Sequence, residues 1–125
     1  FEGYIKQILP LDIMVPPSGQ GAIGIETRDE GEIRDFLQPL NCENTFREIS
    51  IERKLQEKIG GGCHAPLGIN AAISDDMLTI FVSFGKEDGS SLINEKQAGN
   101  LGDTEQLMLN VLKKLVDGRL LDIEL

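Results

Sequence analysis

The second half of the chain switches between helical and strand-like spacing of its apolar residues. Apolar positions three and four residues apart predict helices over residues 42–59 and 104–117. Between them the period changes to two, as in half-buried strands, over residues 67–73, 77–84 and 91–97. Short turns join these strands, which predicts antiparallel pairing. Because one face of such a sheet must be covered, the pattern indicates an α+β fold, a two-layer αβββα domain with a three-stranded antiparallel sheet covered by helices.

Residues of particular types mark the ends of both predicted helices. Asn41 is the expected N-cap of the first helix, and Gly60 supplies the left-handed position that ends it. Asp103 or Thr104 caps the second helix, and Gly118 ends it. The predicted core-facing residues of the two helices are Phe46, Ile49, Leu55, Ile59, Leu107, Val111, Leu112 and Leu115.

The first forty residues have a weaker pattern with several prolines. Residues 1–9 have roughly helical spacing and are interpreted as the tail of a helix ended by the following proline. Residues 10–21 are rich in proline and glycine and predict a loop. Residues 22–28 alternate in polarity and predict a short strand, and residues 29–40 predict a short helix with acidic residues in its first turn.

Composition narrows the class of protein. The 125 residues are 40% hydrophobic and 26% charged, as expected for a soluble globular domain. The net charge of −9 argues against nucleic acid and anionic membranes as partners. No apolar run is long enough to span a membrane, and no signal peptide is evident. Two cysteines without a secretion signal favour a reducing, cytoplasmic location. The chain starts at Phe1, so we expect it to be part of something longer.

Cys63 stands in the stretch "KIGGGCHAPLG", surrounded by small residues directly after a predicted helix. This indicates an accessible thiol on a flexible loop. Cys42 is expected to be a partly buried residue near the start of that helix, which is about 25 Å long. A disulfide between the two cysteines is therefore not expected, because its Cα atoms must lie within about 7 Å. One histidine and two cysteines are also too few for a zinc site, and His64 is expected to be a loop residue and not a catalytic base.

The stretch "GQGAIG" at 19–24 matches the G-x-G-x-x-G pattern of dinucleotide-binding proteins. That fingerprint needs a preceding strand and a helix that starts within it, whereas prolines precede this stretch and a predicted strand follows. Two other interpretations stay open. The stretch can be a turn that enters a strand, or its glycines can expose backbone N–H groups to an acidic ligand.

Two segments together resemble a known family. "VPPSGQGAIGIETR" at 15–28 and "ERKLQEKIGGGCHAPLGINAAI" at 52–73 are similar, in order and spacing, to the P-x-x-G-Q-G-A-[LIV]-G-[IL]-E and E-R…G-G-C-x-[AVT]-P-[LI]-G segments of the hydroxymethylbilane synthase (porphobilinogen deaminase) family. The resemblance runs from about residue 7 to the C-terminus. It implies that residues 41–125 are the C-terminal, third domain, and that residues 1–40 are the remnant of an upstream α/β domain that forms the catalytic cleft.

The resemblance also implies a chemistry. Members of the family are transferases that join four porphobilinogen units into hydroxymethylbilane, with release of ammonia, in porphyrin and heme biosynthesis. They build the chain on a dipyrromethane cofactor that is held by a thioether to the cysteine of the G-G-C motif, which by position is Cys63. Gly61 and Gly62 would leave room for the rings, and Gln20 and Gly21 match the turn that lines the cleft near the cofactor.

The resemblance leaves important parts of the family's site outside this chain. The aspartate that assists the pyrrole nitrogens, and the Arg and Lys cluster that binds the substrate's carboxylates, lie upstream in the family. We therefore expect no catalytic residue here and no activity of the chain alone, with porphobilinogen and the growing polypyrrole bound through the missing domains. The full enzyme is expected to be a monomer, and the fragment is expected to self-associate. Two alternatives stay open, namely a non-catalytic acidic α+β interaction module and a redox-sensing thiol domain.

Overall fold

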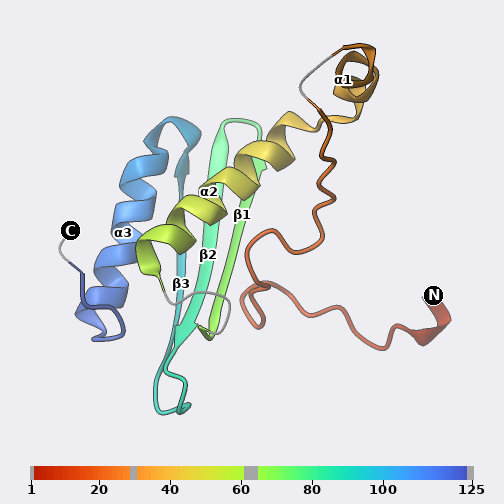
Figure 1. The fold of residues 1–125 in the computed structure, drawn as a ribbon. Coiled ribbons are helices and arrows are strands. Elements are labelled where there is room, and N and C mark those ends of the chain that lie inside the picture. The colour runs from red at the N-terminus through yellow and green to blue at the C-terminus, as the bar shows by residue number, and fades with distance from the viewer. Residues whose placement is uncertain (1, 29–30, 61–64, 124–125) are drawn as a thin grey trace.

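The computed structural model describes residues 2–28, 31–60 and 65–123. Its centre is one antiparallel sheet of order β1-β2-β3, with strands β1 (Leu67–Ser74), β2 (Met77–Gly85) and β3 (Leu92–Asn100). Helices α2 (Glu43–Ile59) and α3 (Thr104–Asp117) pack against the same face of this sheet (Figure 1). The predicted two-layer α+β fold is confirmed, and β1 and β3 form the two edges of the sheet.

The register of the sheet follows the alternation in the sequence. Ala71 pairs with Ile80 and Ile69 with Val82, so these side chains point together toward the helices. The core consists of apolar side chains from both layers, namely Ile51, Leu55, Ile59, Ile69, Ala71, Leu78, Ile80, Val82, Leu107, Met108, Val111, Leu112 and Leu115. Five of the thirteen come from α3 and three from α2, so the two helices together close one face of the sheet.

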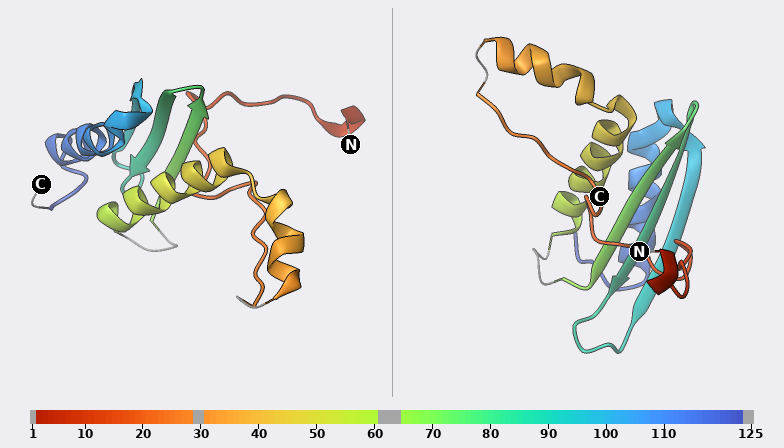
Figure 2. Two further views of the ribbon diagram at one scale, coloured as in Figure 1. Left: turned by 90° about the horizontal axis from the view of Figure 1, so that it is seen from above. Right: turned by 90° about the vertical axis from the view of Figure 1, so that its right-hand side faces the viewer.

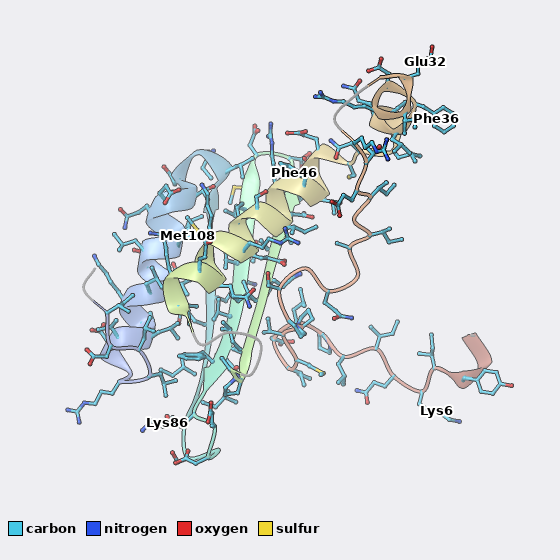
Figure 3. The ribbon with its side chains drawn as sticks, in the orientation of Figure 1. Lys6, Glu32, Phe36, Phe46, Lys86 and Met108 are labelled. Atoms are coloured by element: carbon cyan, nitrogen blue, oxygen red, sulfur yellow. The ribbon has the colours of Figure 1, made fainter. Side chains whose placement is uncertain are left out.

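Helix α2 differs from the prediction at its beginning. It starts at Glu43 with Cys42 as N-cap, whereas Asn41 ends the preceding 3-10 turn. Phe46, predicted to face the core, is 63% exposed. Nine residues, or about two and a half helical turns, separate Phe46 from the buried Leu55, so Phe46 lies on the side of α2 opposite the core. It also stands near the beginning of α2, which projects toward α1 (Figures 1 and 3). The end of α2 agrees with the prediction, since Gly60 has a positive φ of 76°.

The first forty residues contain less regular structure than predicted. A 3-10 turn spans Glu2–Tyr4, and helix α1 (Glu32–Leu37) continues into a 3-10 turn at Gln38–Leu40. The predicted helix over 1–9 is wrong beyond that first turn, and the predicted strand over 22–28 is wrong. The reason is the lack of a partner, since a strand requires a neighbouring ladder and Ile23 is 92% exposed. Figure 2 shows the N-terminal end and α1 lying away from the two layers.

Candidate functional site

A tight turn at Gly19, Gln20 and Gly21 is the first predicted site element. Gly19 and Gly21 have φ values of 75° and 85°, a backbone conformation that favours glycine. The Gln20 N–H donates to the Pro17 carbonyl at 3.1 Å. In the part of the chain that the structure describes, no strand precedes this turn and no helix begins in it, which excludes the dinucleotide-binding interpretation. Gln20 and Gly21 are exposed.

The residues just before this turn pack along the free edge of β1. The Ile69 N–H donates to the Pro16 carbonyl at 2.9 Å. Gly68 is buried, and a Cβ added to it would overlap the carbonyl group of Val15. The glycine in the "APLG" motif is therefore required by a close approach between two backbones. The glycine turn is thus held beside the first residues of β1, which begins at Leu67.

Two carboxylates from α2 continue the contacts along the same edge. The Ala71 N–H donates to Oε1 of Glu52 at 2.9 Å, and the Ile73 N–H donates to Oε1 of Glu48 at 2.7 Å. Together with Ile69, three alternate amides of β1 that point away from β2 thus find acceptors. Unpaired edge amides are a template for aggregation, and these contacts satisfy them without another strand.

Glu52 also contacts the glycine turn, and this contact was not predicted from the sequence. Its Oε2 accepts the N–H of Gly19 at 2.6 Å, and its side chain is only 5% exposed. The signal was present in the sequence, because helical spacing from Leu55 and Ile59 places position 52 on the apolar face of α2. This contact limits the interpretation that the glycines of this stretch expose N–H groups. The amides of Gly19 and Gln20 donate within the protein, so they are not offered to an acidic ligand.

The predicted anchor Cys63 lies outside the described residues, as do Gly61, Gly62 and His64. The structure does describe both flanks of this segment. On one side α2 ends at Ile59, and the Gly60 N–H donates to the Gln56 carbonyl at 2.8 Å. On the other side the Pro66 carbonyl accepts the N–H of Gly85 at 3.1 Å, and β1 begins at Leu67. The segment that carries Cys63 therefore joins the end of α2 to the beginning of β1.

An open depression runs along the solvent side of α2 and reaches Gly60. It is lined by Ser50, Arg53, Lys54, Gln56, Glu57 and Gly60. Arg53 and Lys54 bring two cations to this side of the helix, although Lys54 also pairs with Glu105 at 3.6 Å. There is thus free space on the face of α2 that leads to Gly60, with the charged side chains of Arg53, Lys54 and Glu57 along it.

Cys42, predicted to be partly buried, is exposed. It lies at the N-cap of α2. The Thr45 hydroxyl, followed by the Thr45 amide, favours the thiolate and lowers the pKa of Cys42, against a smaller opposing effect of desolvation. A thiolate at a helix N-terminus is also favoured by the helix dipole.

We therefore expect Cys42 of this chain to react with iodoacetamide at lower pH than Cys42 of the Thr45→Val variant. The pH midpoint of alkylation, measured by mass mapping of the peptide that contains Cys42, should rise in the variant because the hydroxyl no longer favours the thiolate. Equal midpoints in the two proteins would contradict the assigned role of Thr45. Peptide mapping separates this reaction from any at Cys63.

The described residues contain no group of three or more His, Cys, Asp or Glu side chains arranged to hold a metal ion. Within the same ranges, every helix is too short or too polar to cross a lipid bilayer.

These features define a two-layer α+β domain in which a docked glycine turn lies along an edge strand, and in which a cysteine-containing segment joins a helix to that same strand. Residues 46–117 match the family model described as "Porphobilinogen deaminase, C-terminal domain". The chain belongs to the porphobilinogen deaminase family, and the resemblance found from its motifs is confirmed.

Individual relatives agree with the family model. A protein of Campylobacter hominis is 42% identical over 95 residues, which cover 74% of this chain and 31% of the relative. One of Campylobacter lari is 42% identical over 94 residues, covering 75% and 30% of the two chains. One of Prochlorococcus marinus is 34% identical over 116 residues, covering 92% and 37%. All three are named porphobilinogen deaminase, and this chain spans about a third of their length.

Proposed function

We propose that this chain is the cofactor-anchoring part of a hydroxymethylbilane synthase, a transferase that joins four porphobilinogen units with release of ammonia in tetrapyrrole biosynthesis. The observation that carries the proposal is the match of residues 46–117 to the C-terminal domain of porphobilinogen deaminase, with the G-G-C sequence of that family at Gly61, Gly62 and Cys63. The Campylobacter hominis and Prochlorococcus marinus relatives, which match 74% and 92% of this chain, carry the name of that enzyme.

In this proposal Cys63 is an anchor. Its Sγ forms a C–S bond to the aminomethyl carbon of a pyrrole, the C–N bond of that carbon breaks, and the thiol proton leaves with the amine as ammonia. No oxidant or reductant is needed. The dipyrromethane held in this way would supply the pyrrole carbon to which substrate units are added. Because the anchor is not released in each turnover, the thiol needs access more than a lowered pKa.

Several described residues fit a tethered dipyrromethane with its acidic side groups. Gly60, like the two glycines after it, lacks a side chain that would crowd the thiol. The depression that reaches Gly60 has Arg53 and Lys54 along it beside a single carboxylate, Glu57, among its described lining residues, and cations attract carboxylates. At the turn, the backbone amides of Gly19 and Gln20 already donate within the protein. The exposed Gln20 side chain and Gly21 backbone would therefore be the parts of the turn that contact the dipyrromethane.

We further propose that residues 1–40 belong to an upstream domain and residues 41–125 to the anchoring domain. Large apolar side chains exposed in the first part support this, namely Tyr4, Ile5, Ile8, Leu9, Ile13, Met14, Ile23, Ile25, Ile33, Phe36 and Leu40. Such a surface is typical of one that packs against more protein. The catalytic and carboxylate-binding residues would then lie in the remaining two thirds of the enzyme. The isolated chain would be inactive and would self-associate. The full-length enzyme would be a cytoplasmic monomer.

The test is the intact mass of the full-length protein that contains this chain. We expect an added mass equal to one dipyrromethane, which disappears in Cys63→Ser and persists in the matched control Cys42→Ser. The control carries the same substitution at a cysteine outside the G-G-C sequence. An unmodified Cys63 would contradict the proposal and favour an interaction module. An added mass that survives Cys63→Ser would contradict the role of Cys63 as the anchor. A modification that a thiol reductant removes would favour the redox-sensing alternative.

A further inference from the structure

Glu52 is the one charged side chain that is buried in the part of the chain described by the structure. A buried carboxylate is unfavourable unless hydrogen bonds compensate for the lost water. Here each oxygen has its own donor, Ala71 N–H for Oε1 at 2.9 Å and Gly19 N–H for Oε2 at 2.6 Å. These are the distances of charge-assisted hydrogen bonds. The two donors are far apart in the sequence and belong to different parts of the structure.

The bond to Ala71 connects the two elements on either side of the predicted anchor. Glu52 is in α2, which ends at Ile59, and Ala71 is in β1, which begins at Leu67. The segment that carries Cys63 runs from one to the other. A bond between α2 and β1 therefore sets the separation and orientation of the two ends of that segment.

The bond to Gly19 connects the same carboxylate to the glycine turn. The preceding residues are held independently, through the Pro16 carbonyl that accepts the Ile69 N–H and through the close packing of Val15 on Gly68. Beyond Gly19 the chain turns away from the sheet, and Gln20 and Gly21 are exposed. Loss of the Glu52 bond would therefore release the turn without detaching the residues before it.

We propose that Glu52 is a positioning residue, whose carboxylate holds the Gly19–Gln20–Gly21 turn at a set place relative to the two elements that flank Cys63. The functional part of this inference rests on the proposed function, because it assigns the turn a place beside the tethered pyrroles. Among the described residues Glu52 hydrogen-bonds to backbone amides alone, so we infer that it acts through the turn and is not a catalytic residue.

Glu48 provides a matched control on the same helix and the same strand edge. Within the described ranges it accepts from the Ile73 N–H alone, so Glu48→Gln keeps an oxygen for that donor. Glu52→Gln has one oxygen for two donors, and its NH₂ group must face an N–H. Since the Ala71 amide is buried while that of Gly19 is only partly so, the oxygen is expected to remain with Ala71. The same substitution thus removes the bond to the turn at position 52 and no bond at position 48.

The first experiment is amide hydrogen exchange by NMR on this chain. In Glu52→Gln the Gly19 amide should exchange about tenfold faster or more, as expected for loss of a hydrogen bond to a charged acceptor. In Glu48→Gln the Gly19 amide should be unchanged, and protection of the central strand at Ile80 should be unchanged in both. If Glu52→Gln does not fold, Glu52→Asp keeps the charge but withdraws the oxygens by one methylene, and the same acceleration at Gly19 is expected. An unchanged exchange rate of the Gly19 amide would overturn the proposal that Glu52 holds the turn.

The second experiment uses the full-length protein with porphobilinogen. Glu52→Gln should lower kcat about tenfold, with partly elongated chains accumulating on the enzyme in the intact mass spectrum, while Glu48→Gln behaves as wild type. The added mass on Cys63 should be retained in both variants. Wild-type kinetics in a Glu52→Gln protein with a released turn would overturn the positioning role. So would a loss of activity that simply parallels thermal stability in both variants. Absence of the added mass from the wild-type protein would instead contradict the proposed function. The hydrogen-exchange experiment would still test the bond between Glu52 and Gly19 independently.

Discussion

Gly68→Ala is expected to lower the free energy of unfolding of this chain by about 2 kcal/mol, as in other overpacked sites. The new methyl group would meet the backbone carbonyl of Val15, which cannot move aside by a change of rotamer. The residues before the glycine turn must then leave the edge of β1. The change is measured by urea unfolding followed by far-UV circular dichroism, with faster exchange of the Ile69 amide as the local readout, because that amide loses the Pro16 carbonyl.

Gly118→Ala is the matched control for this prediction. A Cβ there would overlap Cδ1 of Ile93, the end of a flexible side chain, and the nearest backbone atom, the Lys114 carbonyl oxygen, would be 3.2 Å away. The Gly118 φ of −76° is compatible with alanine. The free energy of unfolding should therefore change by less than about 1 kcal/mol. Equal effects of the two substitutions would show that the approach of Val15 to Gly68 does not decide the stability of this edge.

Leu55→Ala is expected to have the largest effect on stability, a decrease of about 3–4 kcal/mol in the free energy of unfolding. Leu55 is fully buried between α2 and the sheet. Truncation would remove its apolar contacts and leave a cavity that the surrounding side chains fill only in part. The same urea titration measures the change, and the slope of the transition should stay constant if the native state remains compact.

Phe46→Ala provides the contrast, because both residues belong to α2 and were predicted to face the core, although their separation of nine residues places them on opposite sides of the helix. Phe46 is largely exposed, so its replacement should change the free energy of unfolding by no more than about 0.5 kcal/mol. A loss comparable to that of Leu55→Ala would mean that the beginning of α2 packs against more protein in solution than this chain's own sheet.

The order of elements in the second half could be predicted because each local signal agrees with its neighbours. The change of apolar period from helical to two occurs between Gly60 and Leu67, and the structure changes from helix to strand over the same residues. Helix α3 has the predicted bounds, and Gly118 ends it. The first part was harder because apolar spacing predicts an element only where a partner surface exists. Ile23 and Ile25 alternate as in a strand, but in the described part of the chain no strand pairs with them.

Part of the candidate site was also predictable. The G-Q-G and G-G-C sequences carried the family resemblance, which the family model confirms, and the roles proposed for Cys63, Gln20 and Gly21 follow from it. Glu52 was not singled out. A glutamate in a helix is usually solvated, and only its helical phase hinted at burial. The requirement for glycine at position 68 could not be predicted either, since no local pattern shows that the backbone of Val15 will pack against it.

The sequence by itself therefore determined the α+β class, the central helix–strand order and the family of this protein. Periodicity and capping act between near neighbours, and the family motifs can be read as letters. Only the tertiary structure decided that Glu52 holds Gly19 to β1 and that the backbone of Val15 lies against Gly68. These outcomes depend on which surfaces meet across the sheet edge. Contacts between residues 15–19 and β1 join positions about fifty residues apart, and no local spacing specifies them.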